Sequence, residues 1–107
     1  MPALPLEGIK VVDFSRVLAG PLSTQVLGDL GADVIKIEHP ERGDDTRDWG
    51  IRIGETETTY YYAFNRNKRS VALDLGDPAM VEAARALVAD ADVVVENFKQ
   101  GGMERFG

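Results

Sequence analysis

The sequence contains no cysteine, which excludes disulfides, thiolate catalysis and zinc sites built on cysteine. It has a single histidine and its carboxylates are scattered, so we expect no metal-binding constellation. No apolar run approaches the length that spans a bilayer, and the first residues lack the basic and apolar segments of a signal peptide. We therefore expect a protein that holds no metal, crosses no membrane and resides in the cytoplasm.

Basic residues are in the minority, with 12 Lys and Arg against 18 Asp and Glu and a net charge of −6. This balance disfavours nucleic-acid binding, which needs a basic face. A phosphorylated ligand is still allowed, because a local basic cluster can hold an anion in an acidic protein. Hydrophobic residues make up 44% and charged residues 28% of the 107 residues, which is typical of one folded domain.

Four short apolar segments predict β-strands, over residues 9–14, 33–38, 70–75 and 92–96. A helix is expected between the first two, beginning at Pro21 and ending at Gly31. Its apolar stripe comprises Leu22, Val26, Leu27 and Leu30. Asp77 and Pro78 predict the start of a further helix, as an N-cap and a first-turn proline. The buried face of that helix is expected to hold Met80, Ala83, Ala84, Leu87 and Val88.

The segment from His39 to Thr59 carries no hydrophobic period, and residues 60–64 are interpreted as a short helix. The order of elements predicts an α/β fold, namely a Rossmann-like, doubly wound and mainly parallel sheet of four strands. The apolar run over residues 92–96 suits a strand in a sheet that is covered on both faces.

Ligands of such sheets bind beyond the carboxyl ends of the strands. The first loop, residues 15–20, has the small residues Ala19 and Gly20 ahead of a helix N-terminus, where anions are favoured. It matches neither the dinucleotide fingerprint nor the P-loop. The loop therefore indicates either a phosphorylated ligand or simply a tight turn from strand to helix.

Other candidates also have two interpretations. The basic residues at 66, 68 and 69 pair either with phosphates or, as favoured here, with carboxylates on a solvated surface. Asn97 and Phe98 offer an amide and an aromatic face for a purine, although Phe98 equally suits a core position. His39 is more typical of a structural histidine. No nucleophile–base pair stands out.

Several motifs occur together in a fixed order. They are Leu6–Asp13, Ala19-Gly20-Pro21, Leu27–Glu38, Gly43–Arg47, Asn65–Ser70, Leu73-Asp74-Leu75, Val95–Phe98 and Met103–Gly107. In combination they resemble the opening of family III CoA-transferases, the relatives of formyl-CoA transferase and carnitine CoA-transferase. The resemblance covers residues 6–107, and it implies that residues 1–107 are the N-terminal portion of a larger CoA-binding, Rossmann-like domain.

The resemblance implies an acyl-CoA substrate, a carboxylic acid acceptor and no tightly bound cofactor. The implied CoA-binding positions are Val17, Leu18, Ala19, His39, Leu73, Asn97, Phe98 and Arg105. Two positions that are basic in formyl-CoA transferase hold His39 and Gly76 here, so different phosphate contacts are expected.

The family's nucleophile is an aspartate that would lie beyond Gly107, so we expect no catalytic residue in this chain and no activity from it alone. That carboxylate attacks the thioester to give a mixed anhydride and then an aspartyl-CoA thioester, and the acceptor acid reacts in turn. Family members also form interlocked homodimers. A 107-residue piece is expected to leave an edge strand exposed, which invites association.

Alternative functions are an α-methylacyl-CoA racemase, which would use a downstream His and Asp, and a stand-alone CoA- or nucleotide-binding module. The segment Asn65–Ser70 favours the transferase over the racemase. A receiver-type signalling domain is disfavoured, because Asp13 alone does not make the acidic cluster that such a domain needs.

Overall fold

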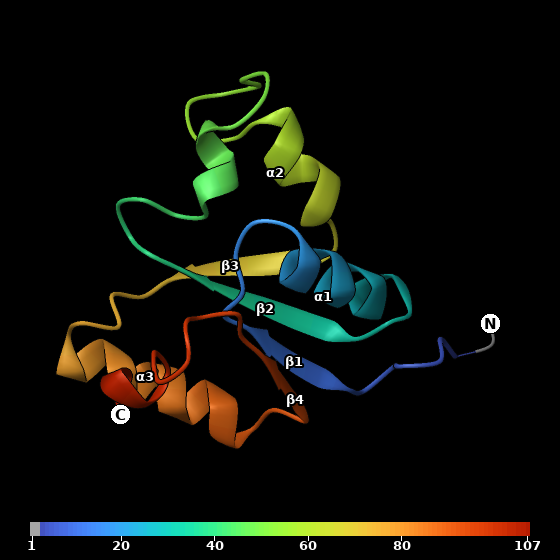
Figure 1. Cartoon of the computed structure of the whole chain (residues 1–107). Helices are drawn as coiled ribbons and strands as arrows, with labels where there is room; N and C mark the ends of the chain where they lie inside the picture. Colours follow the sequence, from blue (N-terminus) through green and yellow to red (C-terminus); the bar gives the residue numbers. More distant parts are fainter. Residues whose placement is uncertain (1–2) are drawn as a thin grey trace.

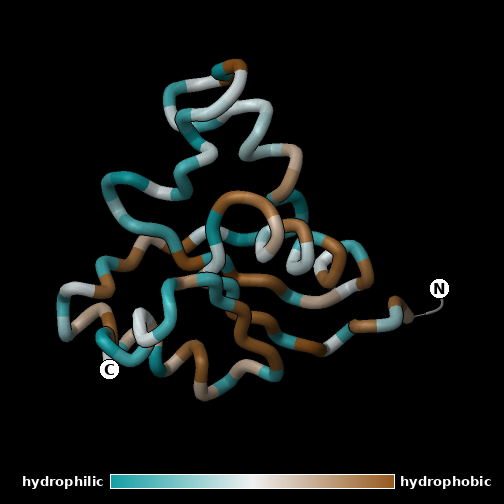
Figure 2. Tube along the Cα trace, viewed as in Figure 1, coloured by the Kyte–Doolittle hydropathy of each residue, from teal (hydrophilic) through white to brown (hydrophobic). Residues whose placement is uncertain are grey.

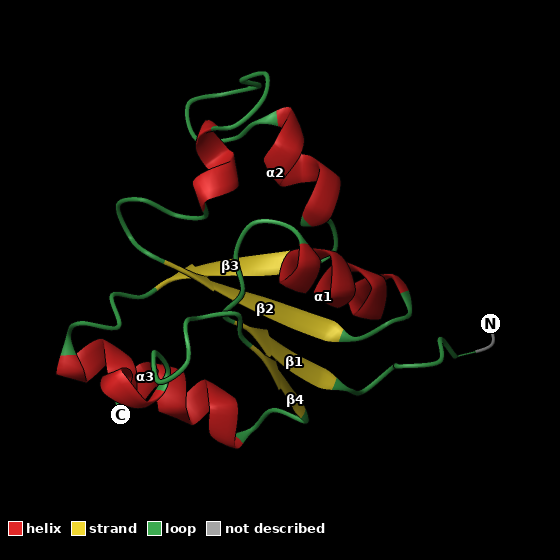
Figure 3. Cartoon of the chain, in the orientation of Figure 1, coloured by secondary structure: helices red, strands yellow, loops and turns green. Residues whose placement is uncertain are grey.

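A computed structural model describes residues 3–107. These residues form one four-stranded sheet in the order β3-β2-β1-β4, in which every strand pair is parallel (Figures 1 and 3). The strands are β1 (Lys10–Asp13), β2 (Asp33–Glu38), β3 (Lys68–Ala72) and β4 (Val93–Val95). The predicted α/β class with a four-stranded parallel sheet is confirmed.

Two long helices cover the sheet, α1 (Ala19–Asp29) and α3 (Pro78–Ala89). Successive side chains of a strand point to opposite faces, and the two hydrophobic clusters follow this alternation. Val11 and Val34 pack with Leu27 of α1, whereas Val12 and Ile37 pack with α3. Helices α1 and α3 therefore cover opposite faces of the sheet. Figure 2 shows that the central strands between them are largely hydrophobic.

The α3 face of the sheet is apolar, but the α1 face carries charge. Along β2, Ile35 and Ile37 belong to the cluster under α3, while Lys36 and Glu38 alternate with them and are also buried. Burying charges requires partners. The polar network described below supplies these partners.

The chain between β2 and β3 contains two short helices, the 3-10 helix η1 (Asp45–Asp48) and α2 (Thr59–Phe64), which stand apart from the sheet in Figure 1. Side-chain caps begin both. The carboxylate of Asp44 accepts the Thr46 N–H, and the hydroxyl of Thr58 accepts the Tyr61 N–H. The predicted short helix over residues 60–64 is thus confirmed. A last 3-10 turn, η2, spans Glu104–Phe106.

Helix α1 differs from the prediction at its start and in its buried face. It begins at Ala19, so Pro21 lies within the first turn, where a missing N–H costs no hydrogen bond. Its end is as predicted: Gly31 has φ +106°, and its N–H and that of Ala32 bond to the last carbonyls of the helix.

The predicted apolar stripe of α1 was wrong in part. Leu22, Val26 and Leu30 are 42%, 46% and 41% exposed, and only Leu27 packs on the sheet. The buried face is instead Pro21, Thr24 and Gln25. The polar side chains face inward because Thr24 donates to the Asp13 carboxylate and Gln25 accepts the backbone N–H of Arg66.

Two strands also differ from their predicted positions. Strand β3 begins at Lys68, two residues earlier than predicted, because Lys68 pairs in register with Val34 and its ammonium is buried. Leu73 and Leu75 consequently lie in the loop after the strand. Strand β4 is an edge strand in residues 3–107, with Val93 and Val94 partly exposed, although helices do cover both faces of the sheet as predicted.

Helix α3 begins as predicted, but Ala83, which was predicted on its buried face, is exposed. The Asp77 carboxylate accepts the Ala79 N–H, Pro78 opens the helix, and Ala84 is buried against the sheet. In the part of the chain that the structure describes, no helix combines the length and apolar character needed to cross a bilayer. Nor does any group of three metal-ligating side chains come together within residues 3–107.

Candidate functional site

The strand order places a crevice at one defined point of the sheet. β1, β2 and β3 are added in one direction, and β4 then pairs with the other side of β1. The loops that follow β1 and β4 therefore diverge from a topological switch point, which is where open parallel sheets bind ligands.

A cavity of about 480 Å³ opens at this end of the sheet, and we call it the switch-point crevice. Its apolar wall comes from the ends of three strands, η2 and the loop after β4. The lining residues are Phe14, Arg16, Ile37, Glu38, His39, Arg42, Gly43, Asp44, Asp45, Leu73, Asp74, Leu75, Gly76, Phe98 and Phe106. An apolar cavity with a few convergent polar groups is the usual form of a small-molecule site.

Asn97 and Phe98 join the two loops at the switch point. The Asn97 side chain accepts the Arg16 N–H at 3.1 Å and donates to the Arg16 carbonyl at 2.8 Å. The Phe98 ring lies 6.5 Å from that of Phe14 and 5.9 Å from the Arg16 guanidinium. Phe98 thus both closes the core below and presents a ring to the crevice.

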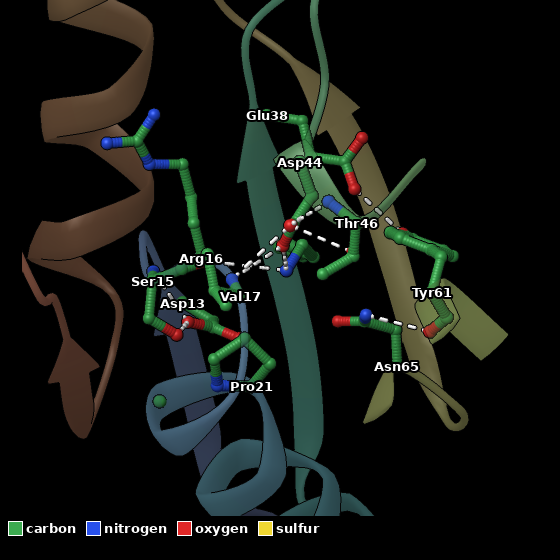
Figure 4. A network of polar contacts seen from close by, with 12 residues as sticks. Asp13, Ser15, Arg16, Val17, Pro21, Glu38, Asp44, Thr46, Tyr61 and Asn65 are labelled. Atoms are coloured by element: carbon green, nitrogen blue, oxygen red, sulfur yellow. Dashed lines mark hydrogen bonds and ion pairs between the residues drawn. The ribbon is translucent and has the colours of Figure 1, made fainter. Parts of the chain in front are cut away.

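Beneath the first loop, the Asp13 carboxylate is the centre of a buried network (Figure 4). It accepts the Ser15 N–H at 2.8 Å and the Ser15 hydroxyl, and it also accepts the Thr24 hydroxyl at 2.6 Å. Lys68 approaches the same carboxylate at 3.1 Å with 1% of its side chain exposed. Burial lowers the pKa of Lys68 to about 8 against the opposing attraction of Asp13.

A second buried pair, Lys36 and Asp44, lies beside the first loop at 2.8 Å. The two oxygens of Asp44 accept the Thr46 N–H and hydroxyl, at 3.0 and 2.9 Å, and the Val17 N–H, at 3.3 Å (Figure 4). Burial raises the pKa of Asp44, but the hydrogen bond and charge of Lys36 and the bonds from Thr46 outweigh it. The net pKa of Asp44 lies below its ordinary value.

The third pair anchors the two short helices to β2. Arg47 donates to both oxygens of Glu38, at 2.9 and 3.1 Å, and its guanidinium lies 3.8 Å from the ring centre of Tyr61. The Tyr61 hydroxyl donates to Glu38 at 2.7 Å. Burial first, and then the charge of Glu38, raise the pKa of Tyr61. Every buried side-chain polar atom in residues 3–107 has a hydrogen-bond partner.

The charges left for a ligand are therefore few. Arg16 and Arg42 line the crevice and form no ion pair with any residue from 3 to 107, whereas Glu38 and Asp44 are neutralised by their partners. Two further carboxylates, Asp45 and Asp74, lie on the wall. A guanidinium group offers a planar pair of donors that matches phosphate oxygens.

His39 also lines the crevice. Its Nδ1 accepts the backbone N–H groups of Glu41 and Arg42 at 3.1 and 3.3 Å, so in the neutral ring the proton lies on Nε2. The imidazole thereby holds the turn that carries Arg42.

Only some of the candidate site residues predicted from the sequence line the switch-point crevice. His39, Leu73 and Phe98 line the crevice, and Asn97 lies at its base through Arg16. Val17 is part-buried beside Asp44, while Leu18, Ala19 and Arg105 are not among the lining residues. Of the basic residues before β3, Arg66 pairs with Asp29, Arg69 with Asp33 and Lys68 with Asp13. The pairing with carboxylates is as favoured, but Lys68 is buried rather than solvated.

Sequence reasoning missed Arg16, Arg42 and Phe106 as lining residues, and Lys36 and Asp44 as supports of the first loop. Arg16 follows a strand end and carried a usable signal. Asp44 is eight residues from its partner Lys36 and twenty-seven from Val17, and only the folded chain brings the three together.

Comparison with known proteins identifies the family of this chain. The profile of CoA-transferase family III matches residues 6–107. The chain belongs to CoA-transferase family III. The resemblance predicted from the ordered motifs is therefore confirmed.

Members of CoA-transferase family III with assigned activities are similar to this chain. The human "Succinyl-CoA:glutarate CoA-transferase" is 52% identical over 103 residues, which cover 96% of this chain and 24% of that protein. A "Formyl-CoA:oxalate CoA-transferase" of Rhodopseudomonas palustris (strain TIE-1) is 44% identical over 102 residues, covering 95% and 24%. The chain spans about a quarter of the length of these curated relatives.

Solved structures of the family share the fold. A CAIB/BAIF family protein from Brucella suis has a TM-score of 0.90 and 51% sequence identity, and the match covers 98% of this chain and 29% of that one. A hypothetical protein from Mycobacterium tuberculosis has a TM-score of 0.87 and 44% identity, covering 100% and 29%. The arrangement of strands and helices described above is thus that of family III.

Proposed function

We propose that this chain is the CoA-binding part of an enzyme that transfers CoA between an acyl-CoA and a carboxylic acid. The observation that carries the proposal is the switch-point crevice in a family III chain, where Leu73 and Phe98 face the same cavity as Arg16. The curated relatives bear the names of CoA-transferases, which agrees with this reaction class.

CoA combines a purine, phosphates and a long arm, and the crevice offers a complement to each. Phe98 and Leu73 present apolar surface on which the adenine stacks, and Arg16 and Arg42 supply guanidinium groups for the phosphates. Arg42 lies three residues beyond His39 in the same wall, which offsets the basic residue that His39 replaces. The remaining proposed contacts are Val17, Leu18, Ala19, His39, Asn97 and Arg105.

The covalent chemistry is assigned to an aspartate outside this chain. Its carboxylate attacks the thioester carbonyl and CoA leaves as a thiolate, which gives a mixed anhydride. The thiolate then attacks the aspartyl carbonyl, and the first acid leaves as a carboxylate. The acceptor carboxylate reverses these two steps, which returns the aspartate and yields the new acyl-CoA. The part played by residues 3–107 is to hold the CoA moiety while the acyl group changes.

A transfer assay on the protein expressed from its complete gene tests the reaction. Donor–acceptor pairs taken from the relatives, succinyl-CoA with glutarate and formyl-CoA with oxalate, are incubated with enzyme and the new acyl-CoA is quantified. We expect acyl-CoA formation that depends on both substrates. Solvent deuterium incorporated at the α-carbon of a branched acyl-CoA, without transfer, would establish the racemase instead.

The binding role is tested by calorimetry with CoA on matched variants. Loss of a stacking aromatic weakens binding by roughly 1–3 kcal/mol, so we expect Phe98→Ala to raise the Kd about fivefold or more. Phe64→Ala is the control, because Phe64 packs on Tyr60 of α2 and does not line the crevice. Equal affinities in the two variants would contradict the site, and binding without transfer would favour the stand-alone module.

A further inference from the structure

The turn formed by Ser15, Arg16 and Val17 is held by side chains from three different parts of the chain. Asn97, after β4, bonds to both backbone groups of Arg16. Lys36 donates to the Ser15 carbonyl at 3.3 Å, and Asp44 accepts the Val17 N–H at 3.3 Å. Consecutive peptide groups of this turn are thus fixed from outside it.

Val17 has φ +76°, in the left-handed region. This conformation is unfavourable for an L-residue and especially for a β-branched one. A residue in such a conformation persists only when its surroundings determine it, and such residues gather at binding sites. Here the side chains that bond to the backbone of Ser15, Arg16 and Val17 hold Val17 in this conformation.

The Lys36–Asp44 pair has no evident role in core stability. Both side chains are completely buried. Well-packed apolar residues generally stabilise a core as well as a buried ion pair does. The pair does make contacts that apolar residues would not make. Lys36 bonds to the carbonyl of Ser15, and Asp44 accepts the N–H of Val17 besides capping η1 through Thr46.

We infer that Asp44, paired with Lys36, is a positioning residue that holds Val17 in its left-handed conformation and so sets the shape of the turn that receives CoA. The inference rests on the proposed function in so far as the turn contacts CoA. Arg16 precedes Val17 and α1 begins two residues after it, so the conformation of Val17 sets the direction of both. Asp44 itself acts through the backbone of Val17 rather than on the reacting atoms.

Asp44→Asn tests the inference in the protein expressed from its complete gene. An amide NH₂ in place of either oxygen would face the Val17 N–H, because both oxygens accept it. At Oδ1 the NH₂ would also face the Thr46 N–H, and at Oδ2 the Lys36 ammonium, which are donors as well. A hydrogen bond to a charged group is worth roughly tenfold in an equilibrium constant, so we expect the KM for acyl-CoA to rise about tenfold. The value of kcat is expected to change much less.

The double variant Lys36→Met/Asp44→Leu removes both charges and the acceptor of the Val17 N–H together, and it avoids an unpaired buried ammonium. It is expected to show the same rise in KM with a smaller loss of stability. Val11→Ala is the stability control, because Val11 is a buried core residue that packs with Ala32 and Val34, and its apolar side chain forms no hydrogen bond with the turn. It is expected to lower the Tm and leave KM unchanged.

The Val17→Gly background separates a positioning role of Asp44 from a general effect of Asp44 on stability. Glycine adopts positive φ without strain, so the turn no longer needs Asp44 to hold it. Asp44→Asn should therefore raise KM less in the Val17→Gly background than in the unsubstituted protein. An equal rise in both backgrounds, no rise at all, or an equal rise in Val11→Ala would overturn the inference.

A protein that neither binds CoA nor transfers it would refute the proposed function and not this inference. The three-bond HN–Hα coupling of Val17, which reports φ, then decides. A coupling that changes in Asp44→Asn and not in Val11→Ala supports the positioning role. An unchanged coupling in Asp44→Asn refutes it.

Discussion

At the scale of single residues, Gly20 lies where the chain has no room for a side chain. A Cβ added there would overlap the Ser15 side chain, which is fully buried. We expect Gly20→Ala to displace the first loop, because neither Ser15 nor the start of α1 is free to move. Overpacking of this kind destabilises by about 1–3 kcal/mol.

The effect of Gly20→Ala is measured by urea unfolding. Gly54→Ala is the control, since its Cβ would meet only the end of the flexible Glu57 side chain, at 3.1 Å. Similar midpoints for the two variants would show that the first loop accommodates a methyl group, in contradiction to the structure.

Lys68 gives the protein a specific dependence on pH. Its pKa is about 8 in the folded state and 10.5 in an exposed lysine, so between these values the unfolded chain binds more protons. The free energy of unfolding contributed by Lys68 therefore rises as pH increases from 8 towards 10.5. Urea unfolding across this range should show a steeper rise for the unsubstituted chain than for Lys68→Met. Parallel curves for the two proteins would contradict the lowered pKa.

Residue positions in the site were predictable where strand ends decide them. His39 and Phe98 follow predicted strands and line the crevice, whereas Leu73, which also lines it, was indicated only by the family resemblance. Asp44 and Lys36 were not predictable, because their pairing depends on how the segment after β2 turns back over the strand. Nothing in the local sequence reports such a return.

At the scale of elements, α3 depends on its cap. The Asp77 carboxylate accepts the Ala79 N–H at 2.9 Å, so Asp77→Ala leaves that donor without a side-chain partner. We expect a loss of about 1 kcal/mol in the free energy of unfolding. Asp77→Asn keeps an acceptor oxygen and should cost little. Thermal unfolding of the three proteins compares them, and an equal loss in both variants would argue against the cap.

Helices α1 and α3 show that a hydrophobic pattern predicts where a helix forms better than it predicts which face of the helix is buried. In α3 the cap signal of Asp77 and Pro78 predicted the start, and the pattern predicted the buried Ala84. In α1 the same argument gave the wrong face, because Thr24 and Gln25 turn towards Asp13 and the backbone of Arg66. β3 began earlier than its apolar residues for a related reason, namely the burial of Lys68. In each case a polar contact outweighed hydrophobic periodicity.

At the scale of the whole molecule, the sheet ends on an exposed edge. β4 has no partner on its outer side within residues 3–107, and Val93 is 38% exposed. Such an edge pairs readily with another chain, and a lysine on it opposes pairing. We expect the 107-residue chain to associate as its concentration rises, and Val93→Lys to reduce this association.

Sedimentation velocity over a range of concentrations measures the association. Ala89→Lys adds the same charge at an exposed position on α3 and should leave it unchanged. A monomeric chain at all concentrations would contradict the prediction. The same measurement on the protein expressed from its complete gene tests the homodimer that the family resemblance implies.

The charges on the α1 face of the sheet also affect how the strands find one another during folding. A shift of β3 by one residue along β2 would turn Lys68 into the apolar cluster under α3, because alternate residues face opposite sides. A shift by two residues would keep it on the α1 face but carry its ammonium roughly 7 Å away from Asp13. The valines and isoleucines on the α3 face would tolerate the second error, since one apolar contact resembles another. The charged α1 face would not tolerate that shift, because the buried ion pairs form only in the native register. It therefore favours the correct alignment of the strands on which the crevice depends.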